Sequence, residues 1–196
     1  MNQKFVFRKL QAILRLKAIF ILLSLLSCSQ NETRTGGSLL DVLRDSPSIE
    51  GKESYLKTPY VTAGDRVYMV GHQDGSFPEI GWHIQGEMGG IWDHPIKLMD
   101  GFEAELVQKG QAVPLKRAKS FVNYPVANSH EFEIEDVSLK ATRTQFVPDG
   151  LQGIIVEYLL DNRGQDRAEF TFRFIGNSDL RPTWMGEKTG MKDGPD

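Results

Sequence analysis

The fold is decided by residues 131–174, EFEIEDVSLKATRTQFVPDGLQGIIVEYLLDNRGQDRAEFTFRF. At one end of this stretch, Phe132 and Ile134 alternate with glutamates. At the other end, residues 168–174 place Ala and three Phe on one face, with Glu, Thr and Arg on the other. A period of two residues is that of a half-buried β-strand. Both ends of the stretch are therefore predicted to be strands whose apolar faces lie in a core.

Two further strands and two turns are predicted inside this stretch. Residues 138–147 form a polar, threonine-containing strand, and residues 152–160 form a strongly apolar one. Pro148-Asp149-Gly150 and Asp161-Asn162-Arg163-Gly164 are turn signals between the strands. Successive antiparallel strands joined by tight turns predict an all-β protein, an antiparallel β-sandwich.

The chain before this stretch also shows strand patterns, although its turns are longer. Strands are predicted over 66–70, around Trp82 and Ile91, over the alternating residues 102–106, and over 113–122, where the lysines and arginine make one side of a single strand face solvent. We assign residues 59–182 to the sandwich.

The first 27 residues have the composition of a secretory signal. They carry five basic residues, no acidic residue, and an apolar run over 18–26, which is short for a membrane span. Leu25-Leu26-Ser27-Cys28 is similar to the lipobox of bacterial lipoproteins, so residues 1–27 are predicted to be a cleaved signal helix and Cys28 to be lipidated. An ordinary signal peptide or anchor with an incidental cysteine is the alternative interpretation.

A tether and a short helix are predicted over residues 28–58. Residues 29–37 are polar and end in glycines, as in flexible tethers. Ser38 is a suitable N-cap for a helix near residues 38–45, and Pro47 ends it. The protein is thus expected to be exported and held at a bacterial membrane by lipid alone, on the periplasmic side or at the cell surface.

The charge excludes one class of partner. Removal of residues 1–27 with their five positive charges shifts the formal net charge from −3 to −8. An acidic chain lacks the basic face that a nucleic acid needs. We therefore predict no nucleic-acid partner, and a neutral carbohydrate is compatible with this charge.

Candidate binding residues are concentrated in residues 71–102, which hold two of the three tryptophans, three of the four histidines and seven glycines. Trp82 and Trp92 could offer flat faces to sugar rings, while His83 and Asp93 supply polar groups that fix orientation. The alternative is that both indoles serve packing in the core or against another domain.

Other chemistries have weaker support. His72, His83 and His94 are spaced eleven apart, whereas zinc sites usually show tighter pairs, so no metal is predicted. The glycines of 86–90 lack the Lys-Ser/Thr of a phosphate-binding loop, and no nucleophile motif is present, so no cofactor or catalytic residue is assigned.

Short motifs carry a resemblance to a known family. They are Gly81-Trp82-His83, Glu87-Met88-Gly89-Gly90-Ile91-Trp92, the segment 96–106 and the strand pair within 137–160. These pieces, spread over most of residues 60–182, resemble the N-terminal domain of family 63 glycosidases and related debranching enzymes, the six-hairpin glycosidases. The resemblance implies a super-sandwich domain packed against a helical (α/α)6 barrel that carries the catalytic acid and base.

The family's catalytic carboxylates have no counterpart positions here. Residues 183–196 form no recognisable element and are expected to be a linker or a truncated end, a disordered terminus being the alternative. The expected function is that of a non-catalytic, lipid-anchored N-terminal domain of a glycoside hydrolase, of α-glucosidase or debranching type, that binds carbohydrate and supports a helical catalytic domain. The alternative is a stand-alone glycan-binding surface lipoprotein.

Overall fold

The structure, a computed structural model, describes residues 37–78, 80, 88–135 and 138–182. These residues belong to one compact unit that begins at Gly37. The predicted signal helix, Cys28, Trp82, His83 and residues 183–196 lie outside the described residues. Within those ranges, no helix has both the length and the hydropathy to span a bilayer.

The described elements are mostly strands, joined by short connections. The helical elements are α2 (Leu39–Leu43) and the 3-10 helix η1 (Glu53–Tyr55). The strands are β1 (Ile49–Glu50), β2 (Pro59–Ala63), β3 (Val67–His72), β4 (Gly90–Asp93), β5 (Ile96–Gln108), β6 (Gln111–Pro114), β7 (Ser120–Asn123), β8 (Ala127–Ile134), β9 (Leu139–Phe146), β10 (Ile155–Asn162) and β11 (Thr171–Pro182).

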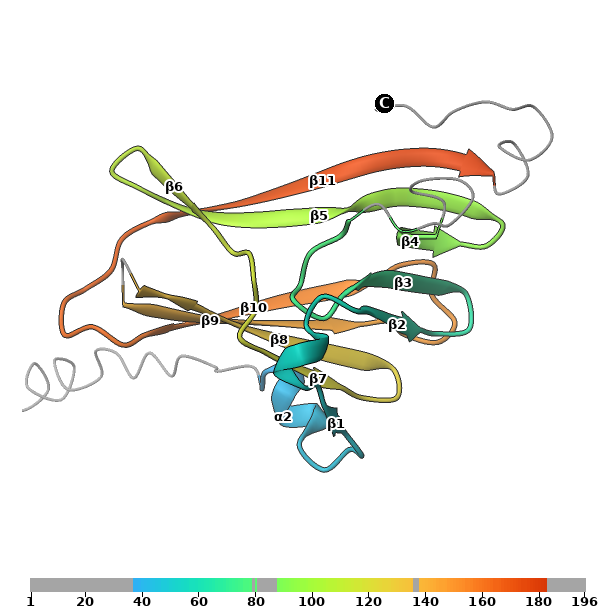
Figure 1. The fold of residues 1–196 in the computed structure, drawn as a ribbon, viewed down its shortest axis with the longest axis horizontal. Coiled ribbons are helices and arrows are strands. Elements are labelled where there is room, and N and C mark those ends of the chain that lie inside the picture. Colours follow the sequence, from blue (N-terminus) through green and yellow to red (C-terminus); the bar gives the residue numbers. More distant parts are fainter. Residues whose placement is uncertain (1–36, 79, 81–87, 136–137, 183–196) are drawn as a thin grey trace, which may run out of the picture. The chain divides into compact units, whose positions relative to one another are not determined.

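The strands form two antiparallel sheets, which confirms the predicted all-β sandwich (Figure 1). Sheet A has the order β1-β7-β8-β9-β10. Sheet B has the order β11-β5-β4-β3-β2, with β6 paired to β5. The last strand, β11, therefore returns to pair with β5 from the middle of the chain.

The core lies between the sheets in two apolar clusters. One cluster joins Ala104 and Leu106 of β5 to Phe132 and Ile134 of β8. The other joins Val67, Met69 and Ile91 of sheet B to Phe121 and Val147 on the side of sheet A. Alternation along each strand turns these side chains inward, as the period-two pattern predicted.

The predicted helix is confirmed, with its capping explained by the sequence. Ser38 accepts a hydrogen bond from the Asp41 backbone N–H through its side chain. The Asp41 carboxylate in turn accepts from the Ser38 backbone N–H, which completes a capping box.

The single strand predicted over 113–122 is wrong. The segment contains the end of β6 in sheet B and part of β7 in sheet A, with a crossing connection between them. Arg117 has a φ of 63° and interrupts the extended backbone. Leu115 and Ala118 are buried in this connection, so their apolar character reflects a link between layers rather than a continuous strand.

The phenylalanines of residues 170–174 are less buried than a core stripe would be. Phe174 stacks on Phe102 and Phe172 contacts Tyr158, so both rings face the core side. Phe174 nevertheless remains 48% exposed, because β11 and β10 are the terminal strands of their sheets. The prediction of a fully buried stripe is therefore corrected to an uncovered apolar edge.

Gly90 is the residue that allows the hairpin of β4 and β5 to close. Its φ is +91°, a conformation that side chains rarely adopt. A Cβ atom at this position would lie 2.1 Å from the backbone carbonyl oxygen of Met99. The glycine is thus required both by conformation and by space.

Candidate functional site

Trp92 lies in β4 and is only 2% exposed. Its indole stacks on Tyr68, its register partner on β3, with ring centroids 6.2 Å apart. The indole Nε1–H donates to the Gly89 carbonyl oxygen at 3.0 Å. With its ring covered and its donor satisfied, Trp92 has the environment of a packing residue, the second of the two roles considered from the sequence.

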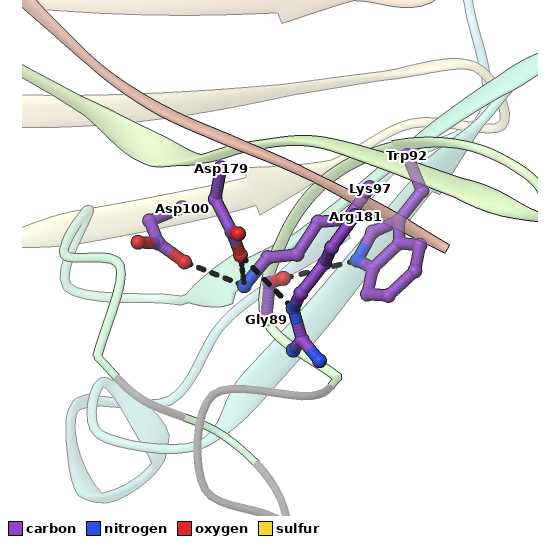
Figure 2. A network of polar contacts seen from close by, with 6 residues as sticks. All are labelled: Gly89, Trp92, Lys97, Asp100, Asp179 and Arg181. Carbon is purple, nitrogen blue, oxygen red and sulfur yellow. Dashed lines mark hydrogen bonds and ion pairs between the residues drawn. The ribbon is translucent and has the colours of Figure 1, made fainter. Parts of the chain in front are cut away.

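A buried ion network lies beside Trp92 and joins the end of β11 to the β4–β5 hairpin (Figure 2). The Lys97 ammonium, 5.9 Å from the Trp92 ring centroid, contacts the carboxylates of Asp100 at 2.5 Å and Asp179 at 2.7 Å. Arg181 donates from Nε to the same Asp179 carboxylate at 3.2 Å. The network fixes β11 at the end where its pairing with β5 becomes irregular.

Asp179 is held in its charged form by its neighbours. Burial alone would raise the pKa of its carboxyl group. The hydrogen bonds and positive charges of Lys97 and Arg181 outweigh burial and lower that pKa below 3.8. The Asp179 carboxylate is therefore ionised at neutral pH.

Asp93 is half-buried and forms a structural contact. Its carboxylate accepts a hydrogen bond at 2.7 Å from Nε2 of Gln152, in the loop between β9 and β10. Trp92 and Asp93 are consecutive residues of β4, so their side chains point to opposite faces of sheet B, while Trp82 and His83 fall outside the described residues. No group of three or more metal-ligating side chains occurs within the described ranges.

A second polar group lies inside the sandwich and was not predicted. The Gln145 amide donates to the Tyr60 hydroxyl at 3.0 Å and to the Asn128 side-chain oxygen at 2.6 Å. Asn128 donates onward to the Thr62 hydroxyl. His130 contacts the same Gln145 amide, with 3.4 Å between Nε2 of Gln145 and Nδ1 of the imidazole. These side chains link β2 of sheet B to β8 and β9 of sheet A.

Arg143 of β9 lies next to this group, where the two apolar clusters meet. It is 2% exposed, and its guanidinium carbon lies 5.9, 5.2 and 5.5 Å from the ring centroids of Phe77, Phe102 and Phe132. Its Nη2 donates to the Gly75 carbonyl oxygen at 2.9 Å. Gly75 has a φ of +86°, and a Cβ there would lie 2.9 Å from Cζ of Phe132 and 3.0 Å from Nη2, so a larger residue would be strained and would crowd the guanidinium.

A pocket of about 180 Å³ opens beside Arg143. Its walls include Ser76, Phe77, Phe102, Lys116, Asn177 and the Arg143 side chain. Lys116 is paired at 2.9 Å with Glu103, and both are about half exposed. The pocket therefore has an aromatic wall, a buried guanidinium and an exposed ion pair.

His130 is fully buried and held neutral. Burial lowers the pKa of its imidazole well below 6.5, and the nearby charge of Arg143 lowers it further. A hydrogen bond to the backbone of His72 acts in the opposite direction but is weaker than the other two effects. In the unfolded chain the imidazole would titrate near 6.5.

This difference predicts acid sensitivity. Below pH 6.5 the unfolded chain binds a proton that the folded His130 does not, so stability present above 6.5 is lost as the pH falls. Between pH 6.5 and 5, the unfolding free energy of the wild type should fall with decreasing pH. We expect the His130→Gln protein to lose less over the same range, by up to about 1.4 kcal/mol per pH unit. Urea denaturation of both proteins at several pH values measures this difference. An equal pH dependence of the unfolding free energy in the two proteins would contradict the role assigned to His130.

The sequence did contain a signal for Arg143. It alternates in step with Leu139 and Ala141 of β9 and with Val147 just after the strand, and all three of these residues are buried. A charged residue on the inward-facing positions of a strand is unusual, because burial of a charge is costly. The strand was predicted to be polar, but Arg143 was not singled out as a charged residue on its buried face.

Comparisons with protein-family models, with curated proteins and with solved structures found no match to this chain. The function is therefore inferred from residues and geometry.

Proposed function

We propose that this chain is the non-catalytic β-sandwich domain of an exported glycoside hydrolase, which supports a helical catalytic domain and helps to position carbohydrate. The observation that carries the proposal is the uncovered apolar edge formed by β10 and β11. Ile155 and Leu159 of β10 are 47% and 48% exposed. Phe172, Phe174 and Ile175 of β11 are 38% to 48% exposed.

This edge has the properties of a surface that packs against protein. Phe172 and Phe174 lie two residues apart on the core-facing side of β11 and are left partly uncovered, while Ile155, Leu159 and Ile175 alternate with inward-facing residues and lie on the outer faces of the two sheets. Exposed apolar patches mark interaction surfaces. The two terminal strands also present unpaired backbone groups on their outer sides, which a neighbouring element can satisfy. A helical domain or additional strands packed on β10 and β11 would cover both.

The environment of Trp92 favours a supporting role over the alternative, a stand-alone glycan-binding lipoprotein. Glycan binding by the two indoles needs Trp82 and Trp92 exposed together, and Trp92 is buried against Tyr68 and Lys97. We propose that its indole stiffens β4, while Trp82, His83 and Asp93 remain proposed carbohydrate contacts. Export and lipidation at Cys28 belong to the same proposal.

The first test is an activity assay on the purified chain. We expect no hydrolysis of maltooligosaccharides, since no catalytic pair is assigned within it. Reading the gene beyond codon 196 should reveal a continuous frame that codes for a helix-rich segment. Hydrolysis by the 196-residue chain alone would refute the supporting role.

The second test addresses the apolar edge in the enzyme encoded by that longer frame. Phe174→Lys should weaken packing at the edge and lower kcat/KM several-fold. Lys57→Ala, an exposed substitution on the segment before β2, serves as the matched control and should leave the kinetics unchanged. Equal kinetics of the Phe174→Lys enzyme and the wild type would exclude the edge as the docking surface.

A further inference from the structure

We propose that the pocket beside Arg143 binds a small monocarboxylate, of the size of a single hexuronate. The site is separate from Trp92 and Asp93, and the proposal does not depend on the glycosidase assignment. It is carried by three observations: the cavity, the buried guanidinium in its wall, and the charge balance of its lining.

The guanidinium lacks a counterion within the described residues. An arginine side chain has five N–H donors; one of them donates to the Gly75 carbonyl oxygen at 2.9 Å, and the Tyr158 hydroxyl is a second polar neighbour of the guanidinium. Nε of Arg143 is buried without a hydrogen-bond partner in this part of the chain. Three aromatic rings surround the charge but accept no conventional hydrogen bond. A buried charge in this condition is costly unless an anion pairs with it.

The lining selects for one negative charge. Arg143 and Lys116 contribute two positive charges, and Glu103 contributes one negative charge. A monoanion therefore balances the pocket, whereas a doubly charged phosphate would be repelled by Glu103. A carboxylate also matches the planar fork of a guanidinium, since it can accept two parallel N–H bonds.

The rest of the pocket suits a compact ring with hydroxyl groups. Phe77 and Phe102 provide an apolar wall. Asn177 provides a polar group beside it, as does the oxygen of Ser76, whose hydroxyl donates to the Asp74 carboxylate at 2.6 Å. A volume of about 180 Å³ is smaller than the pockets that hold drug-sized ligands, which start at roughly 300 Å³. A single sugar acid fits these dimensions and chemistry, and a longer glycan does not.

The experiment titrates the full chain with D-glucuronate and follows the backbone amides and the Arg143 Nε–H by NMR. D-glucose is the neutral match, and sodium sulfate at equal ionic strength tests for a general anion site. We expect saturable shifts of Arg143 and of residues 75–77 with glucuronate only.

Variants separate binding from folding. Asn177→Ala and Lys116→Ala change exposed parts of the lining and should weaken glucuronate binding by about fivefold to tenfold, with an unchanged thermal midpoint. Lys109→Ala removes the same charge at the β5–β6 turn, outside the pocket, and should bind as the wild type does. Arg143→Lys keeps the charge but removes the fork, and is expected to lose binding.

Several results would overturn the proposal. They are the absence of saturable glucuronate shifts, equal shifts with glucose, and equal shifts with sulfate. Unchanged affinity in both Asn177→Ala and Lys116→Ala would also overturn it, since these variants do not depend on the structural role of Arg143 in the core.

Discussion

Gly90→Ala is expected to destabilise the sandwich by about 4 kcal/mol, the upper range for single substitutions. The new Cβ atom would lie 2.1 Å from the Met99 carbonyl oxygen, and the backbone at φ +91° is strained for alanine. Since the obstacle is backbone rather than a flexible side chain, the β4–β5 hairpin must open to relieve it. Urea denaturation followed by circular dichroism gives the change in unfolding free energy.

Gly150→Ala is the matched control for this prediction. Gly150 also has a positive φ, +73°, but nothing lies within 4 Å of the Cβ position. Only the conformational cost remains, and we expect a loss of about 1 kcal/mol. Similar losses in the two variants would show that backbone conformation alone, and not the contact with Met99, makes Gly90 necessary.

Asp179→Ala is expected to cost about 3 kcal/mol, because it removes a buried carboxylate from the buried Lys97 ammonium. Asp100 contacts the same ammonium but is half exposed, so Asp100→Ala should cost about 1 kcal/mol or less. The comparison changes one carboxylate at a time around one cation. Thermal and urea unfolding measure both, and a larger loss for Asp100→Ala would contradict the network as described.

The effect of Asp179 should also depend on pH with a defined sign. Its folded pKa is lowered, so its contribution is complete above the ordinary value of 3.8 and is lost as the pH falls through the folded pKa. The stability difference between wild type and Asp179→Ala should therefore shrink as the pH decreases below 3.8. A difference that stays constant down to pH 2 would show that the carboxylate acts by packing alone.

Period-two patterns predicted the sandwich, because burial of one face per strand leaves a direct trace in the sequence. Phe132, Ile134, Ala104 and Leu106 are all buried as the alternation indicated. The segment 113–122 misled the prediction, since a buried connection between layers and a strand share apolar residues. The residues of that segment do not indicate that its first half joins one sheet and its second half the other.

The candidate sites were less predictable than the fold. The carboxylate and ammonium of Asp179 and Lys97 lie far apart in the sequence and meet only through the pairing of β11 with β5. The type of residue at Trp92 left two interpretations open, sugar contact and packing, and its burial depends on Tyr68 and Lys97, its register partners on neighbouring strands. The sequence shows which residues are chemically suited to binding or packing, and the register between paired strands determines which side chains lie next to them.

The pairing of β11 with β5 also sets the point during synthesis at which sheet B can be completed. Thr171 pairs with Val107 and Pro182 with Ile96, so sheet B closes only through contacts between distant parts of the chain. Such contacts slow folding, because a long loop must be closed before they form. During synthesis, the β4–β5 hairpin thus emerges from the ribosome well before the strand that completes it, and Phe102 can pack against Phe77 but lacks its second aromatic neighbour until Phe174 has been made.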